Sequence, residues 1–191
     1  NKEKINWVSI EEQLLSIEHL IKAGKVRYFA LSNEWPWGLM EFIRLAKIKN
    51  LPLVCTLQNS YSLINRIVEL GMTEIFFREK LSFFSYSPLG FGHLSGKYLK
   101  DPKAAGRVNL FPGYAQRYNK SGVEKAIKKY DALAAKRNMS LTDLALSFVY
   151  SQWFVTSTVI GATNMNQLKQ NIAAYGLDIV DEELIQEIDA I

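Results

Sequence analysis

Short apolar runs and amphipathic helical segments alternate along this chain, and the alternation limits the folds open to it. Runs rich in apolar, β-branched and aromatic residues, of the length of strands, lie at 26–32, 54–58, 81–87 and 156–161. Segments with helical spacing lie between and after them, at about 10–23, 37–49, 66–79, 123–137, 141–152, 164–175 and 181–191. Capping residues begin three of these segments: Ser9 with Glu12, Ser140, and Asn164 with Gln167. Strands that alternate with helices form βαβ units, so the sequence predicts an α/β protein with about four parallel strands.

Polar residues at the ends of the apolar runs distinguish two architectures, a doubly wound sheet and a (β/α)8 barrel. Neither a G-x-G-x-x-G motif nor a P-loop motif follows any run, so the doubly wound nucleotide-binding fold lacks its signature. Because barrel active sites lie at the carboxyl ends of the strands, the TIM-barrel type is favoured by the polar residues found there: Ser32-Asn33, Gln58-Asn59, Tyr86-Ser87 and Gly161 to Thr163.

The third apolar run continues into a loop rich in glycine, SYSPLGFGHLSGKY, at 85–98. Pro88 removes a backbone donor and ends the strand, and three glycines then allow the backbone to approach a ligand closely. Tyr86 offers a flat ring and Lys97 a cation, which suits a phosphorylated ligand that carries a ring. The loop extends to about residue 121, which is long for a bare connection and typical of a functional loop. Taken alone, the pattern is also compatible with a mere connection.

Length and composition indicate one globular unit. The chain has 191 residues, of which 48% are hydrophobic, so we expect a single domain or part of a domain over 1–191. The one cysteine, Cys55, lies in the apolar run VCTL, and we expect a small buried hydrophobe in a reducing compartment. No apolar run approaches the roughly 20 residues of a membrane span, so we expect a cytoplasmic protein without a membrane partner.

The net charge of +4 could attract nucleic acid, which is a polyanion. The basic residues are dispersed along the chain. The densest group consists of Lys125, Lys128 and Lys129, which have the spacing of the solvent-exposed face of an amphipathic helix. We therefore expect no nucleic-acid partner.

Four segments together, GKVRYFALSNE, LQNSYSLINR, SYSPLGFGHLSGKY and VIGATNMNQLKQNI, resemble in order and spacing the C-terminal half of an aldo-keto reductase. The resemblance runs from about residue 10 to the end of the chain. It is greatest to the Tas-type branch of this family, with the potassium-channel β subunits as more distant relatives. It implies the C-terminal half of a (β/α)8 barrel and an oxidoreductase that uses NADP(H) to reduce a small carbonyl substrate, an aldehyde or a ketone.

The resemblance also implies roles for individual residues. Ser32, Asn33 and Gln58 match the groups that hold the nicotinamide carboxamide, and Tyr86 matches the aromatic residue that stacks on the nicotinamide ring. The loop over the pyrophosphate is matched by Ser87, Pro88, Leu89, Gly90, Phe91 and Lys97, with Arg107 as a cation that closes over the cofactor. The site for the adenosine end and its 2′-phosphate is matched by Gly161, Thr163, Gln167 and Asn171.

The chain departs from the family pattern in two ways. Ala162 and Gln167 stand where the better-known branch has Lys and Arg around the 2′-phosphate, which weakens a charge-based preference for NADPH, although NADPH remains our expectation. The catalytic Asp, Tyr, Lys and His of the family lie on strands that precede this sequence, and neither His19 nor His93 matches the catalytic histidine. We therefore expect no catalytic residue here. The expected partner is a missing N-terminal half-barrel, or else the chain associates with itself. The alternative is a non-catalytic subunit that senses NADP(H), like the channel β subunits.

Overall fold

The computed structural model describes residues 7–111, 113, 116–118, 120–177 and 179–191. The chain forms two compact units, one of Asn1–Asn59 with Glu69–Phe84 and the other of Ser60–Val68 with Ser85–Ile191. The single domain expected over 1–191 stays a prediction.

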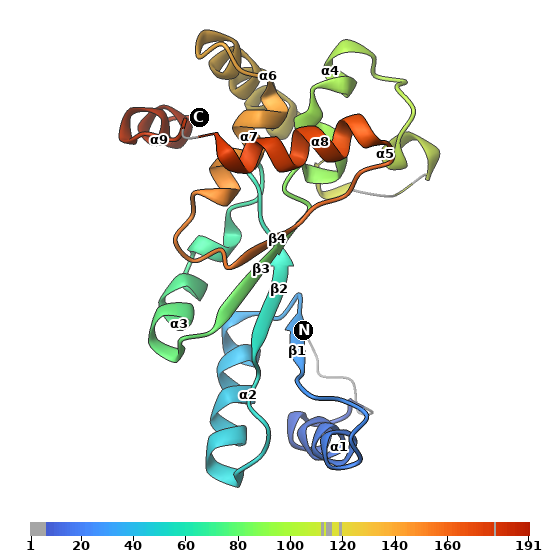
Figure 1. The fold of residues 1–191 in the computed structure, drawn as a ribbon, viewed down its shortest axis with the longest axis vertical. Coiled ribbons are helices and arrows are strands. Elements are labelled where there is room, and N and C mark those ends of the chain that lie inside the picture. Colours follow the sequence, from blue (N-terminus) through green and yellow to red (C-terminus); the bar gives the residue numbers. More distant parts are fainter. Residues whose placement is uncertain (1–6, 112, 114–115, 119, 178) are drawn as a thin grey trace. The chain divides into compact units, whose positions relative to one another are not determined.

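A sheet of four parallel strands alternates with helices along the chain (Figure 1), which confirms the predicted α/β class. The strands are β1 (Ala30–Ser32), β2 (Thr56–Ser60), β3 (Ser82–Tyr86) and β4 (Ser157–Val159), hydrogen-bonded in that order. In the first pair Ala30 lies opposite Thr56 and Ser32 opposite Gln58. Both β2 and β3 pass from one compact unit into the other along the chain.

The first strand begins four residues later than predicted, and β2 begins two residues later. Continued backwards, the register would place Val26 opposite Pro52, which has no N–H to donate, so the ladder cannot extend over the whole predicted run. The pairing reaches back only to Phe29, whose carbonyl accepts a hydrogen bond from the peptide nitrogen of Cys55 at 3.1 Å. The Cys55 side chain is exposed, and its Sγ donates to the same carbonyl at 2.9 Å. The expectation of a buried cysteine was therefore wrong.

The first unit contains α1 (Ile10–Lys22), α2 (Pro36–Lys49) and α3 (Met72–Glu79). Helix α1 begins at Ser9, whose Oγ accepts a hydrogen bond from the peptide nitrogen of Glu12 at 3.1 Å, as the sequence predicted. The third helix is shorter than the predicted 66–79, because Gly71, at φ 109°, separates it from a short 3₁₀ turn, η1 (Ile67–Glu69). In the core of this unit the rings of Phe76 and Phe83 stack with their centroids 4.9 Å apart.

The long loop expected at 89–121 contains short helical elements of the second unit. They are η2 (Gly90–Ser95), α4 (Lys97–Lys100), α5 (Arg107–Leu110) and η3 (Gln116–Tyr118). The remaining elements of this unit are α6 (Ser121–Lys136), α7 (Leu141–Tyr150), α8 (Met165–Ala173), η4 (Ala174–Gly176) and α9 (Glu182–Asp189).

Helix α7 is the core element of the second unit and contacts both α6 and α8 (Figure 1). Ser140 is its N-cap, as expected from the sequence, and forms a capping box with Asp143. Nearly all of its side chains are buried, and Phe148 stacks on the ring of Tyr61 with the centroids 5.9 Å apart. A helix that is apolar on nearly every side belongs inside a domain.

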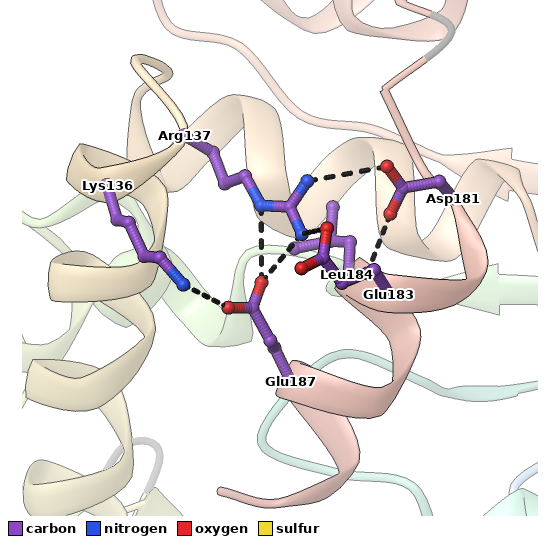
Figure 2. Close-up of polar contacts among 6 residues, drawn as sticks. All are labelled: Lys136, Arg137, Asp181, Glu183, Leu184 and Glu187. Carbon is purple, nitrogen blue, oxygen red and sulfur yellow. Dashed lines mark hydrogen bonds and ion pairs between the residues drawn. The ribbon is translucent and has the colours of Figure 1, made fainter.

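Ion pairs attach α9 to the end of α6 (Figure 2). The Arg137 guanidinium lies 2.9 Å from the carboxylate of Glu183 and 2.8 Å from that of Glu187, and it also pairs with Asp181. The hydrogen bond to Glu187 is the main cause that raises the pKa of Arg137. The Lys136 ammonium reaches the second oxygen of Glu187 at 2.5 Å, so two cations of α6 share one carboxylate of α9.

None of the helices formed by the described residues has the length and apolar character that a membrane crossing requires.

Candidate cofactor site

The three residues predicted to bind the nicotinamide carboxamide lie together in the first unit. Ser32 ends β1 opposite Gln58, and Asn33 follows in the left-handed region at φ 59°. The peptide nitrogen of Asn33 donates to the carbonyl of Gln58 at 3.0 Å, and its Nδ2 donates to the Ser32 hydroxyl at 3.2 Å. Amide and hydroxyl groups supply both donors and acceptors, which an amide ligand needs.

A second set of polar contacts fixes the loop after β1, and it involves Asn59, a strand-end residue to which the sequence analysis assigned no ligand. Asn59 Nδ2 donates to the carbonyl of Glu34 at 2.9 Å, and the Glu34 carboxylate accepts from the peptide nitrogen of Trp35 at 2.9 Å. The Oδ1 atom of Asn59 is buried and has no hydrogen-bond partner among the described residues. Its position directly after Gln58 was the available signal in the sequence.

The predicted pyrophosphate loop, 87–91, is a tight turn of the second unit. The peptide nitrogen of Gly90 donates to the carbonyl of Ser87 at 2.8 Å, and that of Gly92 donates to the carbonyl of Leu89 at 2.9 Å. A Cβ atom on Gly90 would lie 2.6 Å from the side chain of Ile64, so only glycine fits there. Tyr86 ends β3, and its carbonyl accepts from the peptide nitrogen of Tyr61 at 3.2 Å.

Three of the predicted site residues, one in the first unit and two in the second, have a positive φ. Asn33, Ser87 and Phe91 have φ values of 59°, 54° and 57°, in the left-handed region where side chains other than those of Asn and Asp are uncommon. Strain of this kind costs of order 1–3 kcal/mol per residue and is often found at ligand sites. The two strands β1 and β3 are thus each followed directly by a left-handed residue.

Lys97 and Arg107, the two predicted phosphate ligands, differ in their surroundings. The Lys97 ammonium donates to the carbonyl of Ala105 at 3.1 Å and lies 4.8 Å from the centre of the Tyr98 ring. Arg107 is the first residue of α5 and is exposed. A lysine side chain that is already held in one conformation loses little entropy when it binds a phosphate, whereas an exposed arginine must first become ordered.

His93 is a half-buried residue of the same loop. Its ring lies between those of Tyr98 and Tyr118, with centroids at 5.3 and 5.7 Å. Burial, and secondarily the charge of Lys97, lowers the pKa of His93. Its Nε2 atom is buried without a hydrogen-bond partner in the described part of the chain. His19, in contrast, is exposed on α1, as expected.

The residues predicted for the adenosine end form two hydrogen-bonded pairs around the start of α8. The amide oxygen of Gln167 accepts hydrogen bonds from the peptide nitrogen and the hydroxyl of Thr163, and Asn171 Nδ2 donates to the carbonyl of Gly161 at 3.1 Å. Asn164 caps the helix through the peptide nitrogen of Gln167 at 3.0 Å, as predicted. Asn171 is buried, while the other predicted residues of this group are exposed.

Three local groups of predicted residues therefore exist. One is in the first unit (Ser32, Asn33 and Gln58), and two are in the second (Tyr86 to Phe91 with Lys97 and Arg107; Gly161, Thr163, Gln167 and Asn171). Their binding of a cofactor stays a prediction.

The comparison with known proteins matches nearly the whole chain. The sequence model of the Aldo/keto reductase family matches residues 4–191. The protein Tas of Escherichia coli K12 is 40% identical over 184 residues, which are 96% of this chain and 53% of Tas. An aldo-keto reductase of Babesia bovis is 39% identical over 192 residues, covering 95% of this chain and 67% of that protein.

A more distant relative is the L-glyceraldehyde 3-phosphate reductase of E. coli K12, which is 27% identical over 183 residues, 93% of this chain and 53% of that protein. The chain thus spans about half the length of Tas and of this reductase. Proteins of the matched family fold as (β/α)8 barrels, and the parallel strands and helices found here are part of such a barrel, as the sequence predicted. This chain belongs to the aldo/keto reductase family.

Proposed function

We propose that the protein is an NADP(H)-dependent oxidoreductase that reduces an aldehyde or a ketone to an alcohol, and that this chain supplies the cofactor site. Membership of the aldo/keto reductase family supports an oxidoreductase function in general. The observation that carries the specific proposal is the turn after β3, where the Tyr86 ring, a tight turn with two glycines and the held ammonium of Lys97 follow one another within residues 86–97.

The residues present fit a nicotinamide dinucleotide. The Lys97 side chain packs against Gly92 and Gly106, where the absence of a side chain leaves room for its ammonium. Cations and backbone N–H groups are the donors that phosphate oxygens prefer. The cofactor supplies the hydride. Tyr86 would stack on the nicotinamide ring and so present one face of it, and Ser32, Asn33 and Gln58 would hold its carboxamide.

The preference for NADPH over NADH rests on neutral groups in this proposal. The amide NH₂ group of Gln167 offers donors to a 2′-phosphate, and the Thr163 hydroxyl holds Gln167 by donating to its amide oxygen. No Lys or Arg occurs between Gly161 and Leu168. Hydrogen bonds to a charged group are stronger than those between neutral groups, so these donors still favour the phosphate over a hydroxyl.

The proton donor of the reaction lies, in our proposal, in the part of the relatives' length that this chain does not span. Reduction of a carbonyl places negative charge on its oxygen, which must be met by a positioned proton donor. We propose that the missing N-terminal half-barrel carries this donor and is the partner of the chain. Without it, unpaired strand edges and apolar surface would favour self-association.

Activity measurements test the reaction and the division of labour. The 191-residue chain is purified alone and after co-expression with the rest of its reading frame, and NADPH oxidation is followed with 4-nitrobenzaldehyde. We expect turnover only with the other part. Turnover by the chain alone would contradict the division of labour. NADPH binding without turnover in the complete protein would favour the alternative, a sensing subunit that resembles the channel β subunits.

Binding variants test the residue assignments. In the complete protein, Tyr86→Ala should weaken NADPH binding without abolishing it, because aromatic contact contributes about 0.5–1.5 kcal/mol beyond area burial. Gln58→Ala removes carboxamide hydrogen bonds and should also weaken binding, whereas Tyr28→Ala, an exposed tyrosine of the first unit, is the control. NADPH affinity that is unchanged in both Tyr86→Ala and Gln58→Ala would remove the assignment.

A further inference from the structure

Tyr98 makes a cation–π contact with Lys97, a predicted phosphate ligand, although sequence patterns assign it no role. The Lys97 ammonium lies over the Tyr98 ring, 4.8 Å from its centre. A ring face attracts a cation at this distance, and more strongly where water is partly excluded. Both residues are half-buried, so the ring holds the ammonium in a partly dry environment.

Other groups of the second unit confine the Lys97 side chain as well. The carbonyl of Ala105 accepts a hydrogen bond from its ammonium at 3.1 Å. A Cβ atom on Gly92 would lie 3.3 Å from Lys97 Cε, and one on Gly106 would overlap Lys97 Nζ. An ammonium has three N–H donors, so two remain for a ligand after Ala105 is satisfied.

The hydroxyl of Tyr98 does not explain why a tyrosine stands here. Its oxygen is buried without a hydrogen-bond partner among residues that the structure describes, and it lies against Gly106. Since no hydrogen bond to a described residue anchors this hydroxyl, the useful part of Tyr98 is its ring face. Phenylalanine should therefore replace it, and an aliphatic side chain should not.

We propose that Tyr98 is a positioning residue for phosphate recognition, whose ring holds the Lys97 ammonium where it meets a phosphate of the dinucleotide. This inference rests on the proposed function, since the phosphate is that of the proposed cofactor. In this proposal Tyr98 does not contact the ligand. It acts only through Lys97, by keeping the long lysine side chain in one conformation before the ligand arrives.

A double-mutant cycle on NADPH binding by the complete protein tests the proposal. We expect Tyr98→Phe to bind like the parent and Tyr98→Leu to bind about fivefold more weakly, the size of a cation–π contribution of roughly 1 kcal/mol. In a Lys97→Met background, Tyr98→Leu should have no further effect. An equal loss from Tyr98→Leu in both backgrounds would show a merely structural role and overturn the proposal.

A measurement without cofactor separates this inference from the proposed function. Lysine labelled with ¹³C at Cε gives one signal per residue, and the signal of Lys97 is the one that Lys97→Met removes. We expect a ring-current shift of this signal that persists in Tyr98→Phe and disappears in Tyr98→Leu. Absence of the shift, with NADPH binding intact, would overturn the role of Tyr98 alone. A parent protein that shows the shift but binds neither NADPH nor NADH would overturn the proposed function and, with it, the phosphate role.

Discussion

The amide oxygen of Gln167 accepts two hydrogen bonds from Thr163, one from the peptide nitrogen at 2.9 Å and one from the hydroxyl at 3.0 Å. The residue that matches a 2′-phosphate ligand is thereby tied to the loop before α8, and its amide NH₂ group is the part left to face a ligand. Neutral donors give a modest preference for a phosphate over a hydroxyl.

Placing a cation at this position should therefore sharpen the cofactor preference. We expect Gln167→Arg to raise the ratio of NADPH affinity to NADH affinity about tenfold or more, since a charge-assisted hydrogen bond contributes about 1.5–3 kcal/mol. Gln167→Ala, which loses the same two bonds to Thr163 and adds no charge, is the control. Fluorescence titration with both cofactors measures the ratio, and an equal ratio in Gln167→Arg and Gln167→Ala would contradict the assignment.

Arg107 should contribute to cofactor affinity in a way that salt removes. Because this side chain is exposed, its attraction for a phosphate is screened as the ionic strength rises. We expect Arg107→Met to weaken NADPH binding several-fold at low salt and to flatten the dependence of affinity on salt. Lys103→Met, another exposed cation of the same loop, is the matched control. A salt slope equal to that of the parent protein counts against a phosphate role for Arg107.

Gly106 should be sensitive to substitution for a steric reason alone. Its φ of 170° is extended backbone that any residue adopts, but an added Cβ atom would overlap Lys97 and Tyr98. Overpacking of this kind costs typically about 1–3 kcal/mol, so Gly106→Ala should lower the free energy of unfolding by that amount.

Gly122 provides the control for this substitution, because it lies in α6 and a Cβ atom there meets nothing within 4 Å. Gly122→Ala should be neutral or slightly stabilising, since alanine favours the helix by up to about 1 kcal/mol. Urea unfolding of both variants makes the comparison. Equal stability of Gly106→Ala and Gly122→Ala would mean that the loop at 106 shifts to make room.

The sequence predicted those features that depend on residues close together along the chain. The caps of Ser9, Ser140 and Asn164 could be placed because each side chain binds a peptide nitrogen three residues later. The start of β1 could not be placed, since it depends on the residues before β2, where the register would set Pro52 opposite Val26, and the apolar run at 26–29 gives no sign of them.

The candidate site divides in the same way. The polar residues after β1 and β3 were found because they follow apolar runs directly, and the network of Thr163 and Gln167 lies within five residues. The contact of Tyr98 with Gly106 depends on how the loop turns back on itself. This loop has no apolar periodicity, so no pattern in the sequence predicts the contact. The conformations of Ser87 and Phe91 were equally hidden, because side chains of these types seldom adopt a positive φ.

His93 should make stability depend on pH in the mildly acidic range. Burial, and then Lys97, lowers its pKa below the ordinary value of 6.5, so near that pH the unfolded chain binds a proton more readily than the folded protein. The free energy of unfolding is therefore at its full value above pH 6.5 and decreases as the pH falls from 6.5 through the lower pKa of the folded state. The groups that face the imidazole are the Lys97 ammonium and the rings of Tyr98 and Tyr118.

The variant His93→Gln isolates this effect, because glutamine is polar and stays neutral. Urea unfolding between pH 5 and 8 gives the free energy of unfolding of the parent and of His93→Gln at each pH. The titration of all other groups is common to both proteins and cancels in the difference. We expect the parent to lose stability relative to His93→Gln as the pH falls below about 6.5. A difference that stays constant over this range would show that the folded protein accepts a proton on His93 as readily as the unfolded chain does, and that the ring is hydrated in solution.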